Sequence, residues 1–331
     1  MRRSAPSTRQ RGAAILTAML TVVLIATLAS AMLWQQWRGI EVESAQRTRV
    51  QSAWILVGAL DWARLILRED ARQGGADYLS EPWAVPLAPA RLSTFLAAEK
   101  GQALVSDDND AAQAAFLAGQ IEDLQARLNV TNLIQDQKID EPSLAAWKRL
   151  FKHLNLPESE LQAMAQALLR AQKAGADGAG ESQSSANQPL QPLAVADLRW
   201  LGLSQRSLQT LQDFITLLPV RTPINLNTAP PEVLLASVKG LDMAAAQALV
   251  RARASQHMNS LADADKLLNK PEIHFGDDLQ GVSSQFFRVT GQLRLGDVTL
   301  QEMSVLQRAG QQVKTLSRTR QMLPSPDPTL Q

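Results

Sequence analysis

The sequence predicts an α+β fold in which a long N-terminal helix packs on an antiparallel sheet and a large all-α domain is inserted between the strands. Three observations indicate this fold. An uncharged apolar segment continues directly into an amphipathic helical pattern, residues 141–275 have helical periodicity, and strand patterns occur on both sides of that block. At 331 residues the chain is long enough for two folded units.

The first element is an apolar segment over residues 13–34, which has 22 consecutive residues without a charge. As a helix it would be about 33 Å long, enough to cross a bilayer. Arginines and no acidic residue precede it. Because positive charge on the short side of a membrane segment favours the cytoplasm, we expect a single-pass inner-membrane protein with a cytoplasmic N-terminus and a periplasmic head.

Two processing routes fit this segment. A secretory signal would be cut after the Ala-Ser-Ala triplet at 29–31, whereas a cut between Gly12 and Ala13 would keep the helix. Residues 35–75 decide between the routes, because they continue as an amphipathic helix and end at two glycines. A retained helix is therefore predicted, with 13–34 in the membrane. An unrelated signal-anchored periplasmic protein is the alternative.

The first part of the head is expected over residues 76–140. The stretches 114–117 and 119–124 are predicted to be strands that pair with each other. A further strand is predicted over 126–132, where apolar and polar residues alternate and the last position is an asparagine.

The chain returns to strand patterns over residues 276–321, with turns at 296–297 and 309–310 that contain glycine. These strands are expected to join the earlier ones in one sheet on the N-terminal helix. Residues 1–12 are the cytoplasmic leader, and residues 322–331 are expected to be a disordered tail.

Residues 141–275 form the predicted inserted helical domain, interrupted by a flexible loop at 174–192 whose composition does not favour order. The most specific signal inside it is Pro-Ile-Asn-Leu-Asn-Thr-Ala-Pro-Pro-Glu-Val-Leu at 223–234. Thr228 is expected to be the N-cap of a helix, with the two prolines that follow in its first turn.

A second short helix is expected after Gly240, with small residues along one face, namely Ala244, Ala245, Ala248, Leu249 and Ala252. Two short helices packed in this way make a helix-hairpin-helix, SAM-like unit. Such units also bind DNA, through a Gly-apolar-Gly turn whose N–H groups approach a phosphate. Here the turn reads Gly240-Leu241-Asp242, which places a carboxylate where the phosphate would lie.

Arg251 and Arg253 are the arginines that could contact a DNA phosphate from this second helix, so a membrane-tethered DNA-binding protein remains an alternative function. The formal net charge of +1 argues against a large nucleic-acid footprint. Nucleic acid is therefore an unlikely partner in this interpretation.

No enzyme is predicted. The chain has no cysteine, three widely separated histidines and no Gly-x-Ser-x-Gly motif, so thiolate chemistry and zinc-thiolate sites are excluded and no catalytic set stands out. The densest oxygen-ligand cluster is Asp107, Asp108 and Asp110, which are weak candidates for calcium. A solvated turn is the simpler interpretation of these residues, and no cofactor is required.

The N-terminus resembles the leader of type IV pilins and type II pseudopilins. The resemblance rests on the sequence Arg-Gln-Arg-Gly at 9–12, followed by Ala-Ala-Ile-Leu-Thr at 13–17. In that family a prepilin peptidase cuts after the glycine, which here lies between Gly12 and Ala13. The chain departs from the family pattern at Thr17, where most subunits have a glutamate that pairs with the terminal amine of a neighbour in the fibre.

The missing glutamate, the large helical insertion and the Asn-Leu-Asn-Thr-Ala-Pro sequence together resemble the K-type minor pseudopilins of type II secretion systems (general secretion pathway protein K family). The resemblance implies a pilin-like head with an inserted α-domain. It also implies a place at the tip of the pseudopilus, where the protein would initiate and cap assembly for protein export across the outer membrane.

The implied partners are minor pseudopilins I and J in a tip complex, other pseudopilins, the inner-membrane secretion platform and the prepilin peptidase. Calcium is associated with this family through an acidic stretch after the second head helix. In this chain that place reads Met-Ala-Gln-Ala-Leu-Leu at 164–169, which departs from the family pattern.

Overall fold

The computed structural model describes residues 10–92, 115–176, 189–268, 270, 273–276, 278–295 and 298–323. It divides into two units, residues 1–55 and 56–331, each of which is described by itself. Several predicted features lie outside the described residues: the leader before residue 10, the acidic cluster at 107–110, the turn at 296–297, most of the loop at 174–192, and the tail from 324 onward.

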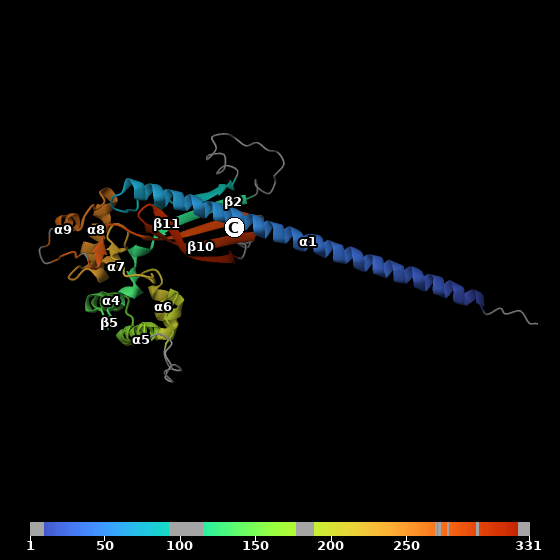
Figure 1. The fold of residues 1–331 in the computed structure, drawn as a ribbon, viewed down its shortest axis with the longest axis horizontal. Coiled ribbons are helices and arrows are strands. Elements are labelled where there is room, and N and C mark those ends of the chain that lie inside the picture. Colours follow the sequence, from blue (N-terminus) through green and yellow to red (C-terminus); the bar gives the residue numbers. More distant parts are fainter. Residues whose placement is uncertain are drawn as a thin grey trace, which may run out of the picture. The chain divides into compact units, whose positions relative to one another are not determined.

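Helix α1 (Gln10–Gln73) is continuous, so the apolar segment and the amphipathic segment belong to one helix (Figure 1). It ends at Gly74 and Gly75, whose φ angles of +67° and +114° lie in the left-handed region that favours glycine. The amide N–H of Gly74 donates to the carbonyl of Asp70 at 3.0 Å and closes the last turn.

The head contains a five-stranded antiparallel sheet in the order β1-β2-β9-β10-β11. Its strands are β1 (Leu87–Arg91), β2 (Ala115–Asp123), β9 (Phe286–Leu295), β10 (Val298–Ala309) and β11 (Gln312–Leu323). Strands from before and after the helical block therefore meet at the β2–β9 pair. Strand β11 extends two residues into the predicted tail.

The predicted pairing of 114–117 with 119–124 is wrong. Residues 115–123 form the single strand β2, and Gly119 lies within it, paired with Gly291 of β9. A glycine inside a strand pattern marks either a turn or a place where another backbone or side chain comes close, and here the second applies. The partner of β2 on its other side is β1.

The second half of α1 packs on one face of this sheet (Figure 1). Leu60, Ala63 and Leu67 of the helix are buried against Trp83 and the sheet residues Phe287, Val289 and Leu306. The rings of Trp83 and Phe287 meet edge to face, with centroids 5.2 Å apart. Burial of these side chains is what holds the head to its helix.

The predicted strand over 126–132 is also wrong, except at two residues. The chain forms η2 (Leu124–Ala126), β3 (Leu128–Asn129), η3 (Val130–Leu133) and the hairpin of β4 (Ile134–Gln135) and β5 (Lys138–Ile139). Strand β3 pairs in parallel with β6 (Ile215–Thr216). The alternation breaks because the asparagines at 129 and 132 turn their side chains toward the loop at 218–222.

The inserted helical block has its own core. Its elements are α4 (Glu141–His153), α5 (Glu158–Ala176), η5 (Val195–Leu201), α6 (Gln205–Leu211), α7 (Pro231–Ser237), α8 (Met243–Ser255) and α9 (Leu261–Leu268), with β7 (Ile224–Asn225) pairing in parallel with β8 (Gln280–Gly281). Trp147 and Phe151 of α4 are buried at its centre, together with Leu161 and Met164 of α5. Met164, Ala167 and Leu168, from the stretch 164–169, thus contribute to this core.

Two details of the predicted helix pair are wrong. The N-cap of α7 is Pro230, and the Thr228 hydroxyl instead donates to the buried carboxylate of Asp123. On α8 the buried positions are Ala245, Ala246 and Leu249, whereas residues 244 and 248 are exposed. The reason is tertiary packing: Ala245, Ala246 and Leu249 lie in the same core cluster as Val233 and Leu234 of α7.

Candidate functional site

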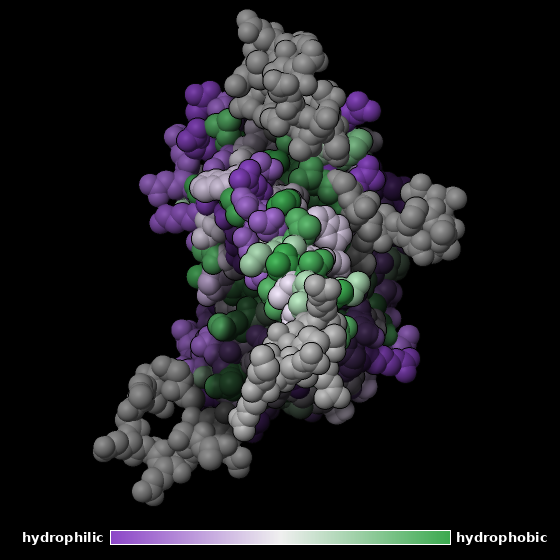
Figure 2. Space-filling model, turned by 90° about the vertical axis from the view of Figure 1, so that its right-hand side faces the viewer, coloured by the Kyte–Doolittle hydropathy of each residue, from purple (hydrophilic) through white to green (hydrophobic). Residues whose placement is uncertain are grey.

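The membrane-type part of α1 exposes its apolar side chains. A window of mean hydropathy 2.3 lies within residues 13–73, and the large side chains from Ile15 to Leu33 are each more than half exposed. Figure 2 views the molecule from the end at which α1 begins, and green, apolar side chains lie near the centre of this face. An unburied apolar helix of this length is suited to lipid or to a neighbouring helix.

Thr17 lies within this segment. Its hydroxyl is 3.1 Å from the carbonyl oxygen of Ala13 and 3.0 Å from that of Ala14, so it donates to its own helix. The Thr17 hydroxyl is therefore satisfied within its own helix. The cleavage site between Gly12 and Ala13 stays a prediction.

The head and the inserted domain meet at a buried polar junction, which we define as Asp77, Asp123, Asn225, Ser284 and Arg308. Asp123, at the end of β2, is buried. One of its oxygens accepts from the amide of Gln125 at 2.7 Å. The other accepts from the hydroxyls of Ser284 at 2.6 Å and Thr228 at 2.5 Å. Burial raises the pKa of this carboxyl, although the hydrogen bonds oppose the shift.

Asn225 is the member of the junction supplied by the inserted domain. Its side-chain Nδ2 is 3.1 Å from the Asp123 carboxylate, 3.1 Å from the Asp77 carbonyl and 3.0 Å from the Ser284 hydroxyl. Its Oδ1 accepts from the amide of Asn227 at 2.9 Å. The side chain of Asn227 in turn donates to the Met258 carbonyl and accepts from the Met258 amide, each at 2.9 Å. The Asn-Leu-Asn sequence at 225–227 thus has a structural role, because its two asparagine side chains bond separate segments of the chain together.

Arg308, on β10, completes the junction from the sheet. Its guanidinium pairs with the carboxylates of Asp70 and Asp77 and donates to the Ser284 carbonyl at 2.7 Å. It also lies 4.8 Å from the centre of the Phe287 ring. Burial raises the pKa of Asp77, and the contact with Arg308 works against that shift. Sequence reasoning missed Asp77, Asp123, Ser284 and Arg308, because no local pattern sets them apart from surface residues.

A second pair of asparagines, in the segment before α4, bonds to the loop at 218–222 of the inserted region. Asn129 donates to the Val220 carbonyl at 2.8 Å and accepts from the Leu218 amide at 3.1 Å. The side chain of Asn132 donates to the Thr222 carbonyl at 2.7 Å and accepts from the Thr222 amide at 3.0 Å. These amide side chains replace the ladder bonds that a longer strand would have made.

Within the described residues, Asp70, Asp77 and Glu81 are the group of carboxylates close enough to hold a cation, with ligand atoms within 4.8 Å of one another. They do not fit a resident calcium ion, because Arg308 already pairs with two of the three. Glu81 accepts from the Tyr78 amide at 2.9 Å and from the Trp83 indole at 2.7 Å. Desolvation raises its pKa to about 7.

The turn between α7 and α8 is occupied by internal contacts. The carboxylate of Asp242 accepts from the amide of Ala245 at 2.7 Å and lies 3.7 Å from the Lys270 ammonium. Arg253 donates to the carbonyls of Leu226 at 2.6 Å and Ala229 at 2.7 Å, and desolvation lowers its pKa to about 10. One of the two arginines considered for phosphate contacts therefore has a structural role.

Comparisons with known proteins identify the family. Two family models described as type II secretion system (T2SS), protein K match residues 126–220 and 224–282. The type II secretion system protein K of Pseudomonas aeruginosa is 29% identical over 317 residues, covering 90% of this chain and 89% of that protein. The protein of the same name from Klebsiella pneumoniae is 27% identical, covering 94% and 96%.

A solved structure has the same fold. It is a chain of the GspK-GspI-GspJ complex of the enterotoxigenic Escherichia coli type 2 secretion system. The TM-score is 0.59 at 18% identity, with 84% of this chain and 98% of that chain covered. The fold, the two family models and the relatives along nearly the whole chain agree, and the chain belongs to the type II secretion system protein K family.

Proposed function

We propose that this minor pseudopilin occupies the tip of the type II secretion pseudopilus, where it initiates and caps assembly for protein export across the outer membrane. The observation that supports this role best is helix α1. Its first part is an exposed apolar span, and one face of its second part packs against the sheet of the head. Such a helix is suited to packing in the membrane and, after extraction, in a fibre.

The chain is proposed to lie in the inner membrane with its N-terminus in the cytoplasm and its head in the periplasm. The arginines before residue 13 support this orientation. Prepilin peptidase is proposed to cut between Gly12 and Ala13, leaving the apolar helix in the mature protein. The role is one of assembly, with no substrate turned over.

Its proposed partners are minor pseudopilins I and J, then other pseudopilins and the secretion platform. The similar structure is a complex of GspK with GspI and GspJ, which supports the first two. Thr17 fits a tip subunit: a glutamate there would have no neighbour above to neutralise it, and an unpaired carboxylate in hydrocarbon is costly.

The α7–α8 pair is proposed to be a helix-hairpin-helix, SAM-like unit that serves packing. Support comes from Asp242, which caps α8, and from Arg253, which is held by backbone carbonyls. The inserted domain would then act as the bulk that prevents another subunit from adding above. Calcium binding at Asp107, Asp108 and Asp110 stays a proposal that rests on residue type alone.

Removal of the chain from cells with an active type II system tests this function. Exported proteins should then accumulate in the periplasm, and overproduction of the major pseudopilin should give few pseudopili. Restoring the wild-type chain should reverse both effects, and the solubilised chain should co-purify with pseudopilins I and J. Normal export and normal pseudopilus number without the chain would contradict the proposal.

A further inference from the structure

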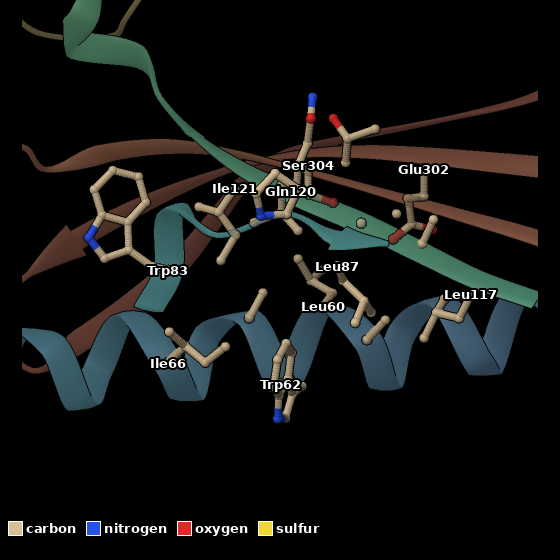
Figure 3. A pocket seen from close by; sticks show the side chains of 18 of the residues that line it. Leu60, Trp62, Ile66, Trp83, Leu87, Leu117, Gln120, Ile121, Glu302 and Ser304 are labelled. Carbon is tan, nitrogen blue, oxygen red and sulfur yellow. The ribbon is translucent and has the colours of Figure 1, made fainter. Parts of the chain in front are cut away.

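A cavity of about 230 Å³ lies in the head between the second half of α1, the segment at 82–87 and the sheet. Figure 3 shows side chains from all three converging on it, with Leu60 and Ile66 on the helix side and Leu117 and Ile121 on the strand side. Trp62 and Val85, which are 41% and 64% exposed, also line it and mark a route from solvent.

The cavity exists because the sheet lacks side chains at this point. Gly119 of β2 is paired with Gly291 of β9, and Gly291 is paired with Glu302 of β10, so two adjacent positions in one row of the sheet have no side chain. The facing helix presents the small residues Ala59 and Ala63. A Cβ added at Gly291 would lie 3.3 Å from the end of the Leu56 side chain, which would have to shift by a few tenths of an ångström.

Two polar side chains occupy the core face of β10 beside this row. Residues 300, 302, 304 and 306 are the buried face of the strand, and the middle two are glutamate and serine, 3% and 1% exposed. Both line the cavity. The Ser304 hydroxyl and Oε1 of Glu302 have no hydrogen-bond partner among the described residues. Buried polar atoms without a partner are unfavourable, and their presence in an apolar cavity points to a missing group.

The charge of Glu302 is already balanced. Its Oε2 accepts from Arg320 at 2.5 Å, and its Oε1 lies 3.2 Å from Nε of Arg318 without forming a hydrogen bond. The fitting occupant therefore brings a neutral hydrogen-bond donor rather than a second cation. An ionised carboxylate would have to lose its hydration to enter an apolar cavity, which is costly.

We propose that this cavity binds a small neutral amphiphile, with an apolar body between α1 and the sheet and one hydroxyl at Glu302 and Ser304. An apolar cavity of about 150 Å³ is large enough to bind benzene, so this larger one accommodates a medium-chain alcohol. Octan-1-ol has the required chemistry: a flexible apolar chain and one terminal hydroxyl that both donates and accepts.

Equilibrium dialysis of radiolabelled octan-1-ol against the full chain in lipid nanodiscs tests the proposal. We expect saturable uptake of one equivalent per chain above that of empty nanodiscs. Octane, which has no donor, should bind about tenfold more weakly, and octanoate should be weaker still because of its charge. In Ser304→Ala the preference for octan-1-ol over octane should decrease.

Ala59→Leu fills the cavity from the helix side and should abolish the saturable uptake. Ala254→Leu, at an exposed position of α8, is the matched control and should bind as the wild type does. If Ala59→Leu lowers the thermal unfolding midpoint too far for the assay, the smaller substitution Ala59→Val takes its place. Equal uptake by wild type and the cavity variants, or equal binding of octane and octan-1-ol, would overturn the proposal. So would a cavity variant that changes only co-purification with pseudopilins, because the occupant would then be a protein side chain.

Discussion

Asp123, at the end of β2, and Asn225, at the end of β7, are joined by a buried hydrogen bond of 3.1 Å. The first residue belongs to the sheet and the second to the inserted helical region, so this bond connects the two parts of the head. Ser284 contacts both residues, at 2.6 and 3.0 Å, just before the chain returns to the sheet. The insertion is thus held by a polar junction at the base of the strands it separates.

Asn225→Ala should destabilise the protein by about 2–4 kcal/mol, because it removes the hydrogen bonds that the Asn225 side chain makes with the Asp77 carbonyl and the Asn227 amide in a buried site. It also removes one of the hydrogen bonds to the Asp123 carboxylate. Urea unfolding monitored by tryptophan fluorescence measures the change. Asn259→Ala, at an exposed position, is the control and should stay within about 0.5 kcal/mol of the wild type. Equal effects of the two substitutions would contradict the account of the junction.

Glu81 should make stability depend on pH between about 5 and 7. Its pKa is about 7 in the folded protein against an ordinary value of 4.5, so the folded state binds its proton more readily than the unfolded state. The free energy of unfolding therefore increases as pH falls through this range, and Glu81 costs stability above it.

In Glu81→Gln the contribution of this residue to the pH dependence should disappear, and at pH 8 the variant should be more stable than the wild type. The amide oxygen of glutamine can still accept from the Tyr78 amide and the Trp83 indole. Urea unfolding at pH 5, 6, 7 and 8 measures this, with Glu69→Gln on the exposed face of α1 as the control. An unchanged pH profile in Glu81→Gln would show that the residue has no such role.

Arg253→Met should destabilise the protein by about 1–3 kcal/mol, because the carbonyls of Leu226 and Ala229 lose their donor. Arg251→Met, at an exposed position of the same helix, should be nearly neutral. Neither substitution should change retention on DNA–agarose, since we expect no salt-dependent DNA binding by the full chain. Salt-dependent retention that both substitutions weaken would favour the DNA-binding alternative.

Thr17→Glu should reduce the amount of chain recovered in complex with pseudopilins I and J. The added carboxylate costs up to about 3 kcal/mol when it is unpaired in the bilayer, less near the ends of the helix, and a tip subunit has no neighbour above to pair with it. Thr17→Ser keeps the hydroxyl that bonds the Ala13 and Ala14 carbonyls and is the control. Undiminished recovery of Thr17→Glu would be evidence against a tip position.

The helices and the outline of the head could be predicted from the sequence, because long periodic patterns and glycine stops are local signals. Helix α1 ends at the expected Gly74 and Gly75. Local reasoning failed where distant contacts decide. Gly119 is of a residue type common in turns, but it pairs with Gly291 inside the sheet. The alternating pattern over 126–132 does not form a full strand, because the side chains of Asn129 and Asn132 make hydrogen bonds to a distant loop.

The junction and the cavity could not be predicted from the sequence for the same reason. The polar residues of the junction come from four separate stretches of the chain, namely Asp77, Asp123, Ser284 and Arg308. In its own stretch, each of them is indistinguishable from a surface residue. Glu302 and Ser304 have the alternation of an ordinary strand, and only the paired register of β2, β9 and β10 places them beside the glycine row.

The N-terminal residue of the mature protein tests the central claim most directly. Mass spectrometry of the chain purified from cells with and without an active prepilin peptidase determines it. The account predicts a mature protein that begins at Ala13 only when the peptidase is active, with the uncut leader present otherwise. A start after Ala31, or an uncut Met1 in both strains, would contradict the pseudopilin pathway.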